Sequence, residues 1–173
     1  GGQDYKITYS ATAEITVQIL NEYGDYIIGK SGTDGIIRCG LSDSFAHQVV
    51  VISNNIKEEI SFDFTVEPYT PVQSLEITDQ EGNDFSEYNA EVGETFSLGC
   101  NIYPVGAETA LKWVSSDPEI AQVDEQGNVT VLNAGYTNIA VYAVDDDGVV
   151  LENIADHLEI YSEKTTDSYF GNS

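Results

Sequence analysis

Few residues of this chain could act as a nucleophile or a general base. It contains two cysteines, Cys39 and Cys100, and two histidines, His47 and His157. Cys39 and His47 are close enough in sequence to suggest a thiol activated by an imidazole. The segment between them, however, has the composition of a strand end followed by a polar loop, and the chain has no nucleophile elbow, P-loop or dinucleotide-binding glycine pattern. We therefore predict that the chain is not an enzyme.

The two cysteines lack the spacing of a metal site or of a disulfide framework. They lie in different halves of the chain, and no C-x-x-C motif occurs. We expect both to behave as small buried hydrophobic residues. A disulfide between the two halves is the alternative.

One acidic run has the residue types of a calcium loop. Asp145, Asp146 and Asp147 precede Gly148, and carboxylate oxygens are the ligands that calcium prefers. An Asp/Gly run is also what a tight β-hairpin turn requires, and the spacing does not fit an EF-hand. We expect no bound cofactor, with calcium at Asp145, Asp146 and Asp147 as the alternative. The segment "DQEGND" at residues 79–84 is a weaker candidate of the same kind.

Tyrosine is the residue type that could recognise a ligand by its surface. The chain has eleven tyrosines, and Tyr88, Tyr103 and Tyr136 fall at loops or strand ends, where a glycan could stack on them. The competing interpretation is that these rings are half-buried at the rim of a core, with only the hydroxyl in water. The three tyrosines are ligand-binding candidates, and the sequence identifies no ligand.

The charge of the chain limits its partners. Thirty acidic and six basic residues give a formal net charge of −24. Nucleic acids and anionic lipids are bound by neutralising their phosphates with Lys and Arg, so both are excluded as partners. No apolar run approaches the roughly 18 residues that span a membrane, which excludes direct membrane insertion.

Charge and strand patterning both place a domain boundary near residue 71. Residues 1–71 carry ten acidic and four basic residues, whereas residues 72–162 carry eighteen acidic residues and one base, Lys112. Apolar residues alternate over 13–20 and 60–66, which predicts strands with one buried face. The glycine-rich segment 29–35 has the composition of a loop. Pro68 and Pro71 mark a short, stiff linker at 67–72.

The segment "LKWVSSDPEIAQVDEQGNVTVLNAG", residues 111–135, holds the only tryptophan. Strand alternation places Leu111 and Trp113 on one face, and Gly127 supplies the positive φ of a tight hairpin. We expect Trp113 to pack in a core, because exposed ligand platforms usually present several aromatic rings. A binding platform around Trp113 is the alternative.

Residues 72–162 resemble a bacterial immunoglobulin-like domain of group 2, a module known from intimin- and invasin-like surface proteins. The resemblance rests on "VQSLEIT", "VGETFSL", "NIYP", the segment 111–135 with its continuation "YTNIAVYA", and the closing "HLEIYS". Gly99 and Cys100 stand where the family favours Thr and Ala, and the last hairpin is longer than usual. The resemblance implies a β-sandwich and a place among repeated modules on a bacterial surface.

We therefore predict an all-β protein with two immunoglobulin-like β-sandwich domains in tandem. Residues 1–71 form a β-sandwich, Ig-like and incomplete, residues 72–162 form the group 2 domain, and residues 163–173 form a polar tail or linker. The chain has no methionine, and we interpret it as a piece of a longer protein.

The expected function is that of a non-catalytic, extracellular segment of a bacterial cell-surface or secreted protein, acting as a spacer, stalk or adhesion module. The alternative is a glycan- or protein-binding accessory module of a larger secreted enzyme. Expected partners are other domains of the parent protein and a host or cell-wall glycan or protein.

Overall fold

The computed structural model describes residues 3–40, 47–53 and 59–164. The chain divides into two compact units, Gly1–Pro71 (unit 1) and Val72–Ser173 (unit 2). The two units share no sheet, and each has its own hydrophobic core. Most of the polar tail expected at 163–173 lies outside the described residues. The all-β class predicted from the sequence is confirmed, since the described residues contain strands and no helix.

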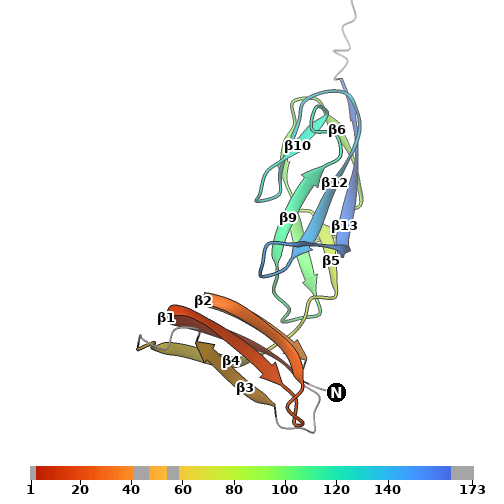
Figure 1. Ribbon diagram of the computed structural model, residues 1–173. Coiled ribbons are helices and arrows are strands. Elements are labelled where there is room, and N and C mark those ends of the chain that lie inside the picture. Colours follow the sequence, from red (N-terminus) through yellow and green to blue (C-terminus); the bar gives the residue numbers. More distant parts are fainter. Residues whose placement is uncertain (1–2, 41–46, 54–58, 165–173) are drawn as a thin grey trace, which may run out of the picture. The chain divides into compact units, whose positions relative to one another are not determined.

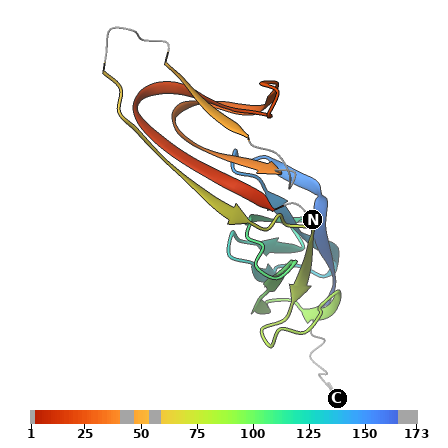
Figure 2. The same ribbon diagram turned by 90° about the horizontal axis from the view of Figure 1, so that it is seen from below.

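Unit 1 is built on one long strand (Figure 1). Its strands are β1 (Asp4–Leu20), β2 (Tyr26–Gly40), β3 (Gln48–Ser53) and β4 (Phe62–Tyr69). β2 pairs with β1 along nearly its whole length, while β4 and β3 pair with the first and second halves of β1 on its other edge. The sheet curves back on itself, as the course of β1 in Figure 2 shows.

This arrangement differs from the sandwich expected for residues 1–71. A sandwich has two separate sheets, whereas the described residues of unit 1 form a single four-stranded sheet. The pairing of β1 with β2 is interrupted between Ser10 and Ile15, where the register shifts. Such an irregularity bends a strand, so one sheet can supply both sides of the core. Ile7 and Tyr9 come from one half of β1, and Ile15 and Val17 come from the other.

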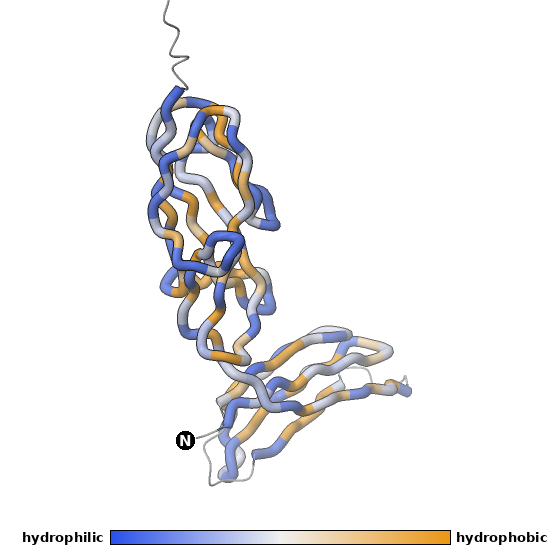
Figure 3. The backbone as a smooth tube through the Cα atoms, turned by 180° about the vertical axis from the view of Figure 1, so that it is seen from behind, coloured by the Kyte–Doolittle hydropathy of each residue, from blue (hydrophilic) through white to orange (hydrophobic). Residues whose placement is uncertain are grey.

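Alternation along β1 follows the sequence prediction. Ile15, Val17 and Ile19 are buried to 2% exposure or less, and their neighbours are not. Hydrophobic and hydrophilic positions interleave along the strands in both units (Figure 3).

The loop expected at 29–35 is wrong, because these residues lie within β2. Two of its glycines allow close packing. A Cβ on Gly29 would lie 2.9 Å from the carbonyl oxygen of Val17, and one on Gly35 would lie 2.7–2.8 Å from the ring of Tyr9. A glycine inside a strand often marks such a close approach and does not end the strand.

Unit 2 is a two-layered sandwich. Its strands are β5 (Ser74–Thr78), β6 (Glu87–Glu91), β7 (Thr95–Ser97), β8 (Gly99–Tyr103), β9 (Ala110–Ser115), β10 (Ala121–Val123), β11 (Asn128–Val131), β12 (Gly135–Val144) and β13 (Val150–Glu163). One layer has the order β6-β13-β12-β9. The other consists of β10-β11-β7 and β5-β8, with Leu98 separating β7 from β8.

The core of unit 2 draws on both layers. Its fully buried members include Ile77 on β5, Val129 on β11, Val141 on β12 and Ile160 on β13. One hydrogen bond also joins the layers, because the backbone N–H of Ile77 donates to a carboxylate oxygen of Asp156 at 2.7 Å. Within this unit the chain enters at β5 and leaves from the opposite end of β13 (Figure 1).

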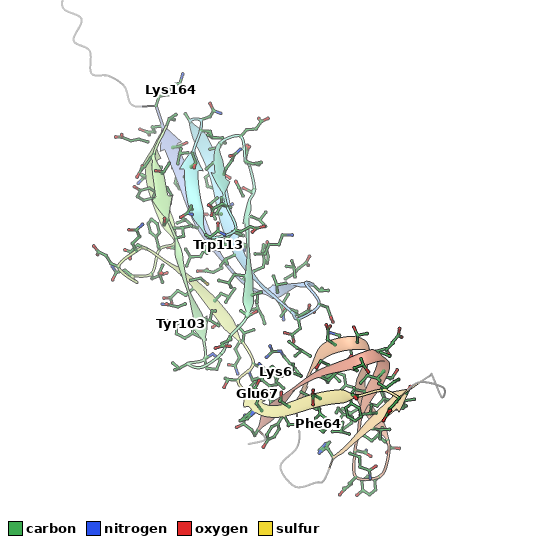
Figure 4. The ribbon with its side chains drawn as sticks, turned by 90° about the vertical axis from the view of Figure 1, so that its left-hand side faces the viewer. Lys6, Phe64, Glu67, Tyr103, Trp113 and Lys164 are labelled. Atoms are coloured by element: carbon green, nitrogen blue, oxygen red, sulfur yellow. The ribbon has the colours of Figure 1, made fainter. Side chains whose placement is uncertain are left out.

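Trp113 is partly buried and packs against this core from β9 (Figure 4). Its ring lies over Gly127, where a Cβ would be 3.1 Å from two ring atoms. Trp113 therefore lies at the edge of the core, with its ring packed on the tight hairpin before β11.

The Ser-Ser-Asp-Pro turn after β9 is attached to β12 by hydroxyl hydrogen bonds. Thr137, 1% exposed, accepts from the backbone N–H of Asp117 at 3.0 Å, and Ser116 accepts from that of Asn138 at 2.9 Å. Ser115 donates to the carbonyl of Ala121 at 2.6 Å. These bonds hold the corner through which the chain passes from one layer to the other.

A pair of alanine substitutions tests the packing of the Trp113 ring on Gly127. Gly127 and Gly148 have φ values of +87° and +81°, so both variants carry left-handed strain of about 1–2 kcal/mol. Only at Gly127 does the new Cβ meet other atoms, since Gly148 has none within 4 Å. We expect Gly127→Ala to lower the free energy of unfolding by about 1–3 kcal/mol more than Gly148→Ala, because the added methyl group overpacks the Trp113 ring and the Leu98 carbonyl oxygen, which lies 3.0 Å away. Urea unfolding followed by tryptophan fluorescence measures this difference. Equal losses would contradict the packing of Trp113 on Gly127.

Candidate functional site

Among the described residues of unit 2, two exposed aromatic side chains lie in contact on the outer face of the β6-β13-β12-β9 sheet. Tyr136 on β12 and Tyr161 on β13 are directly opposite each other in register. Their ring centroids are 5.0 Å apart, with the rings tilted by 47°. Both rings remain open to solvent, at 44% and 39% exposure. The pair offers an apolar surface that projects from an otherwise acidic domain.

Polar groups surround the pair. The Tyr136 hydroxyl lies 3.2 Å from both Glu159 Oε1 and Asn138 Oδ1, and it can donate its one hydrogen to either of these acceptors. The Tyr161 hydroxyl is 3.5 Å from Glu159 Oε2. Desolvation first, and then the charge of Glu159, raises the pKa of Tyr161. The Glu159 carboxylate can accept a hydrogen bond from a bound hydroxyl group, and the Asn138 amide can accept or donate one.

A second aromatic contact lies further along the same face. Tyr142 on β12 and His157 on β13 meet edge to face, with centroids 6.3 Å apart. Between the two contacts lies Ala140, whose neighbours in register are His157 and Val114. We call this surface the tyrosine face, and it consists of Tyr136, Asn138, Tyr142, His157, Glu159 and Tyr161.

Of the three tyrosines singled out in the sequence, only Tyr136 lies on the tyrosine face. Tyr88 on β6 packs edge to face against Phe85 and Phe96, at 5.2 and 4.8 Å. Its hydroxyl donates to the Glu94 carboxylate, and this hydrogen bond, with burial, raises the pKa of Tyr88 to about 12. The Tyr88 ring is therefore part of the core edge.

Tyr103 lies alone at the end of β8, 38% exposed, and its hydroxyl accepts from the Asn101 amide at 3.5 Å. The structure does not bring Tyr88, Tyr103 and Tyr136 together. The partner of Tyr136, Tyr161, was missed because cross-strand register is needed to place them side by side. In a regular hairpin, paired residues are equally far in sequence from the turn, and this rule could have indicated the pair. The register shift after Tyr142 makes the two distances unequal, so the rule fails here.

The acidic residues considered for calcium shape a turn. Asp145 Oδ1 accepts from the backbone N–H groups of Asp147 and Val149, at 2.9 and 2.8 Å. Asp79 and Asp124 form the same turn, and Asn83 and Asn128 each add a side-chain hydrogen bond. These bonds to Asn83 and Asn128 lower the pKa of Asp79 and Asp124.

The same geometry occurs at Asn21, which accepts from Tyr23 and Asp25. Asp145 therefore has a structural role that needs no metal. Over residues 3–40, 47–53 and 59–164, no three His, Cys, Asp or Glu side chains gather as a metal site would require.

The thiols lack the features of a nucleophile. Cys39 is buried in unit 1, and burial, followed by the charge of Asp4, raises its pKa. Burial also raises the pKa of Cys100 to about 11. Both cysteines are free. A reactive cysteine has a lowered pKa, so neither thiol is activated.

Comparison with known proteins identifies the family of unit 2. Residues 72–152 match the family model of the bacterial Ig-like domain (group 2), which confirms the resemblance seen in the sequence. The chain is also similar to a 3-O-alpha-D-galactosyl-alpha-L-arabinofuranosidase of Bifidobacterium longum subsp. longum, with 40% identity over 57 residues. The match covers 32% of this chain and 5% of that enzyme. No helix fit to cross a membrane occurs in the described part of the chain.

A comparison of salts tests the acidic turn at Asp145. We expect sodium chloride to raise the melting temperature of unit 2, because ions screen the repulsion among its acidic residues. Calcium chloride of equal ionic strength should raise it by the same amount. Tryptophan fluorescence during heating measures both. A rise specific to calcium that disappears in Asp146→Asn/Asp147→Asn, but persists in the control Asp84→Asn, would show that the turn binds calcium.

Proposed function

We propose, on the premise that residues 72–152 match the bacterial Ig-like family, that this chain is a non-catalytic extracellular segment of a larger bacterial surface or secreted protein. In that protein, unit 2 acts as a spacer that holds neighbouring domains apart.

The course of the chain through unit 2 carries this proposal. The chain enters at one end, at β5, and leaves at the other, from β13 (Figure 1). A domain with its ends at opposite poles adds its own length to the distance between its neighbours. The two layers share a buried core, so that length is fixed by packing.

The comparisons support a larger parent protein. The matched residues make up one twentieth of the Bifidobacterium enzyme, which therefore has most of its length elsewhere. A segment shared with an enzyme that is much longer than the match is consistent with a positioning role beside other domains. Domains of the family matched by residues 72–152 are typical of bacterial surfaces. The acidic charge favours neutral or basic partners over phosphate-rich polymers.

The tyrosine face favours a second candidate function, glycan binding within the same parent protein. Exposed rings bind the apolar faces of sugars by removing carbon-bound hydrogens from water, and nearby polar groups hydrogen-bond the sugar hydroxyls. Tyr136 and Tyr161 supply the rings, and Asn138 and Glu159 supply the polar groups. The similar enzyme is named for an arabinofuranoside bearing galactose, so glycans containing arabinose and galactose are the first class to test.

A distance measurement tests the spacer. Spin labels at Gln73→Cys and Glu163→Cys, in a Cys39→Ala/Cys100→Ala background, mark the two ends of unit 2. Gln73 is four positions before Ile77, which is hydrogen-bonded to Asp156, and Asp156 is seven positions before Glu163. At about 3.3 Å per residue, these eleven positions predict a separation of about 36 Å. We expect a single narrow distance distribution by pulsed electron paramagnetic resonance. A broad distribution, or one centred below about 20 Å, would contradict a rigid spacer.

Binding to soluble arabinogalactan tests the second function. We expect Tyr136→Ala and Tyr161→Ala each to weaken retardation in affinity electrophoresis by about tenfold, equivalent to ~1.4 kcal/mol. Tyr103→Ala is the matched control, because Tyr103 is similarly exposed but lies off the tyrosine face. Retardation lost equally in all three variants, or absent from the unmodified protein, would eliminate glycan binding by this face and leave the spacer proposal standing.

A further inference from the structure

β4 of unit 1 carries an apolar row on the side of the sheet that forms the core. Val66, Phe64 and Phe62 are opposite Ile7, Tyr9 and Ala11 of β1. Residues opposite each other in a sheet point to the same face, so the row continues the core face of β1.

The two halves of this continuous face differ sharply in burial. Ile7 and Tyr9 are 4% and 2% exposed, whereas Phe62, Phe64 and Val66 are 43%, 46% and 50% exposed. The rings of Phe62 and Phe64 stack with centroids 6.3 Å apart, but the described residues do not cover them. The alternation over residues 60–66 predicted a strand with one buried face. The strand is present and the apolar row shares one face, but the expectation that this face is buried is wrong.

β4 is also an edge strand. Among the described residues it pairs with β1 alone, so its second edge presents backbone donors and acceptors without a strand partner. Such an edge combined with an exposed apolar row is suited to receive another strand.

We propose that β4 pairs with β4 of a second copy of this chain, in antiparallel orientation with Phe64 on the two-fold axis. The interface buries the row Phe62, Phe64 and Val66 of each copy, and it continues the sheet of unit 1 across the dimer. This dimer is independent of the spacer and glycan-binding functions of unit 2.

The sequence of β4 is self-complementary in this register. A two-fold axis through Phe64 places Phe62 opposite Val66 of the second copy, so apolar side chains meet apolar side chains on one face. On the other face it places Asp63 opposite Thr65 of the second copy. A shift of the axis to Thr65 would place Asp63 of each copy opposite Glu67 of the other. Like charges that are directly opposed destabilise a sheet.

The charges near β4 also favour a salt-dependent, weak dimer. Lys6 on β1 forms an ion pair with Glu67 at 2.9 Å, which offsets one of the two acidic charges on the outer face of β4 (Figure 4). The net charge of −24 on each copy remains repulsive at long range. Association should therefore strengthen as added salt screens that repulsion.

Cysteine cross-linking tests the strand register. In a Cys39→Ala/Cys100→Ala background, Phe64→Cys places the two new Cβ atoms about 4.5–5.5 Å apart across the axis, near disulfide distance. Phe62→Cys is the matched control, since its two copies are four positions apart, or about 13 Å. We expect mild oxidation in 0.5 M sodium chloride, a concentration on the order of full screening, to cross-link the Phe64→Cys variant at least tenfold more. Equal cross-linking of both variants, or of neither, would overturn the proposal.

Sedimentation equilibrium tests the contribution of the apolar row in the unmodified protein, where Phe64 is present and no oxidation is needed. We expect the unmodified protein to form dimers as its concentration and the salt concentration rise, and Phe64→Lys to remain monomeric. Val105→Lys is the control, because Val105 is 92% exposed in unit 2 and the substitution changes charge equally. Circular dichroism confirms that each variant is folded. An unmodified protein that stays monomeric under all conditions, or a dimer that survives Phe64→Lys, would overturn the proposal.

Discussion

The alternation of side chains along β12 is the constraint on which unit 2 depends. β12 lies between β13 and β9, so its inward residues must fill the centre of the core. Ile139, Val141 and Ala143 are completely buried. The positions that alternate with these along β12 must point outward, and Tyr136 and Tyr142 occupy two of the outward positions. The core and the tyrosine face are thus two sides of one strand, and neither could shift register without exchanging places with the other.

Unit 1 obeys the same alternation with a different outcome. Every second residue of β1 from Ile7 to Ile19 faces the inside, through the irregularity near Ser10. One sheet therefore lines both sides of a core that would normally need two. As a result, the apolar row on the edge strand β4 is only partly covered and remains exposed to solvent. A unit of about 70 residues buries a modest share of its surface, which is consistent with a core that is incomplete by itself.

Local patterning predicted the strand class and much of the core, and it failed where tertiary contacts decide. Ile15, Val17 and Ile19 were identified because alternation depends on neighbours in sequence. The segment 29–35 was mistaken for a loop because Gly29 and Gly35 serve packing against β1, which composition cannot reveal. Tyr88 was proposed as a ligand residue, but its ring packs against Phe85 and Phe96 and its hydroxyl bonds to Glu94. These contacts depend on the tertiary structure, so the sequence pattern could not show them. Tyr136 was identified without Tyr161, since the pair exists only in the register of β12 and β13.

The entry of the chain at β5 and its exit from β13 determine how unit 2 would respond to tension. A pull on the two ends acts along the strands, so the hydrogen bonds of β5 with β8 and of β13 with β12 and β6 are loaded together, in shear. Bonds loaded together share the force, whereas bonds opened from one end break in sequence at a lower force. The hydrogen bond from Ile77 to Asp156 ties the first strand directly to the last. Under tension between its ends, unit 2 would therefore resist extension along the axis on which, as a spacer, we propose that it sets distance.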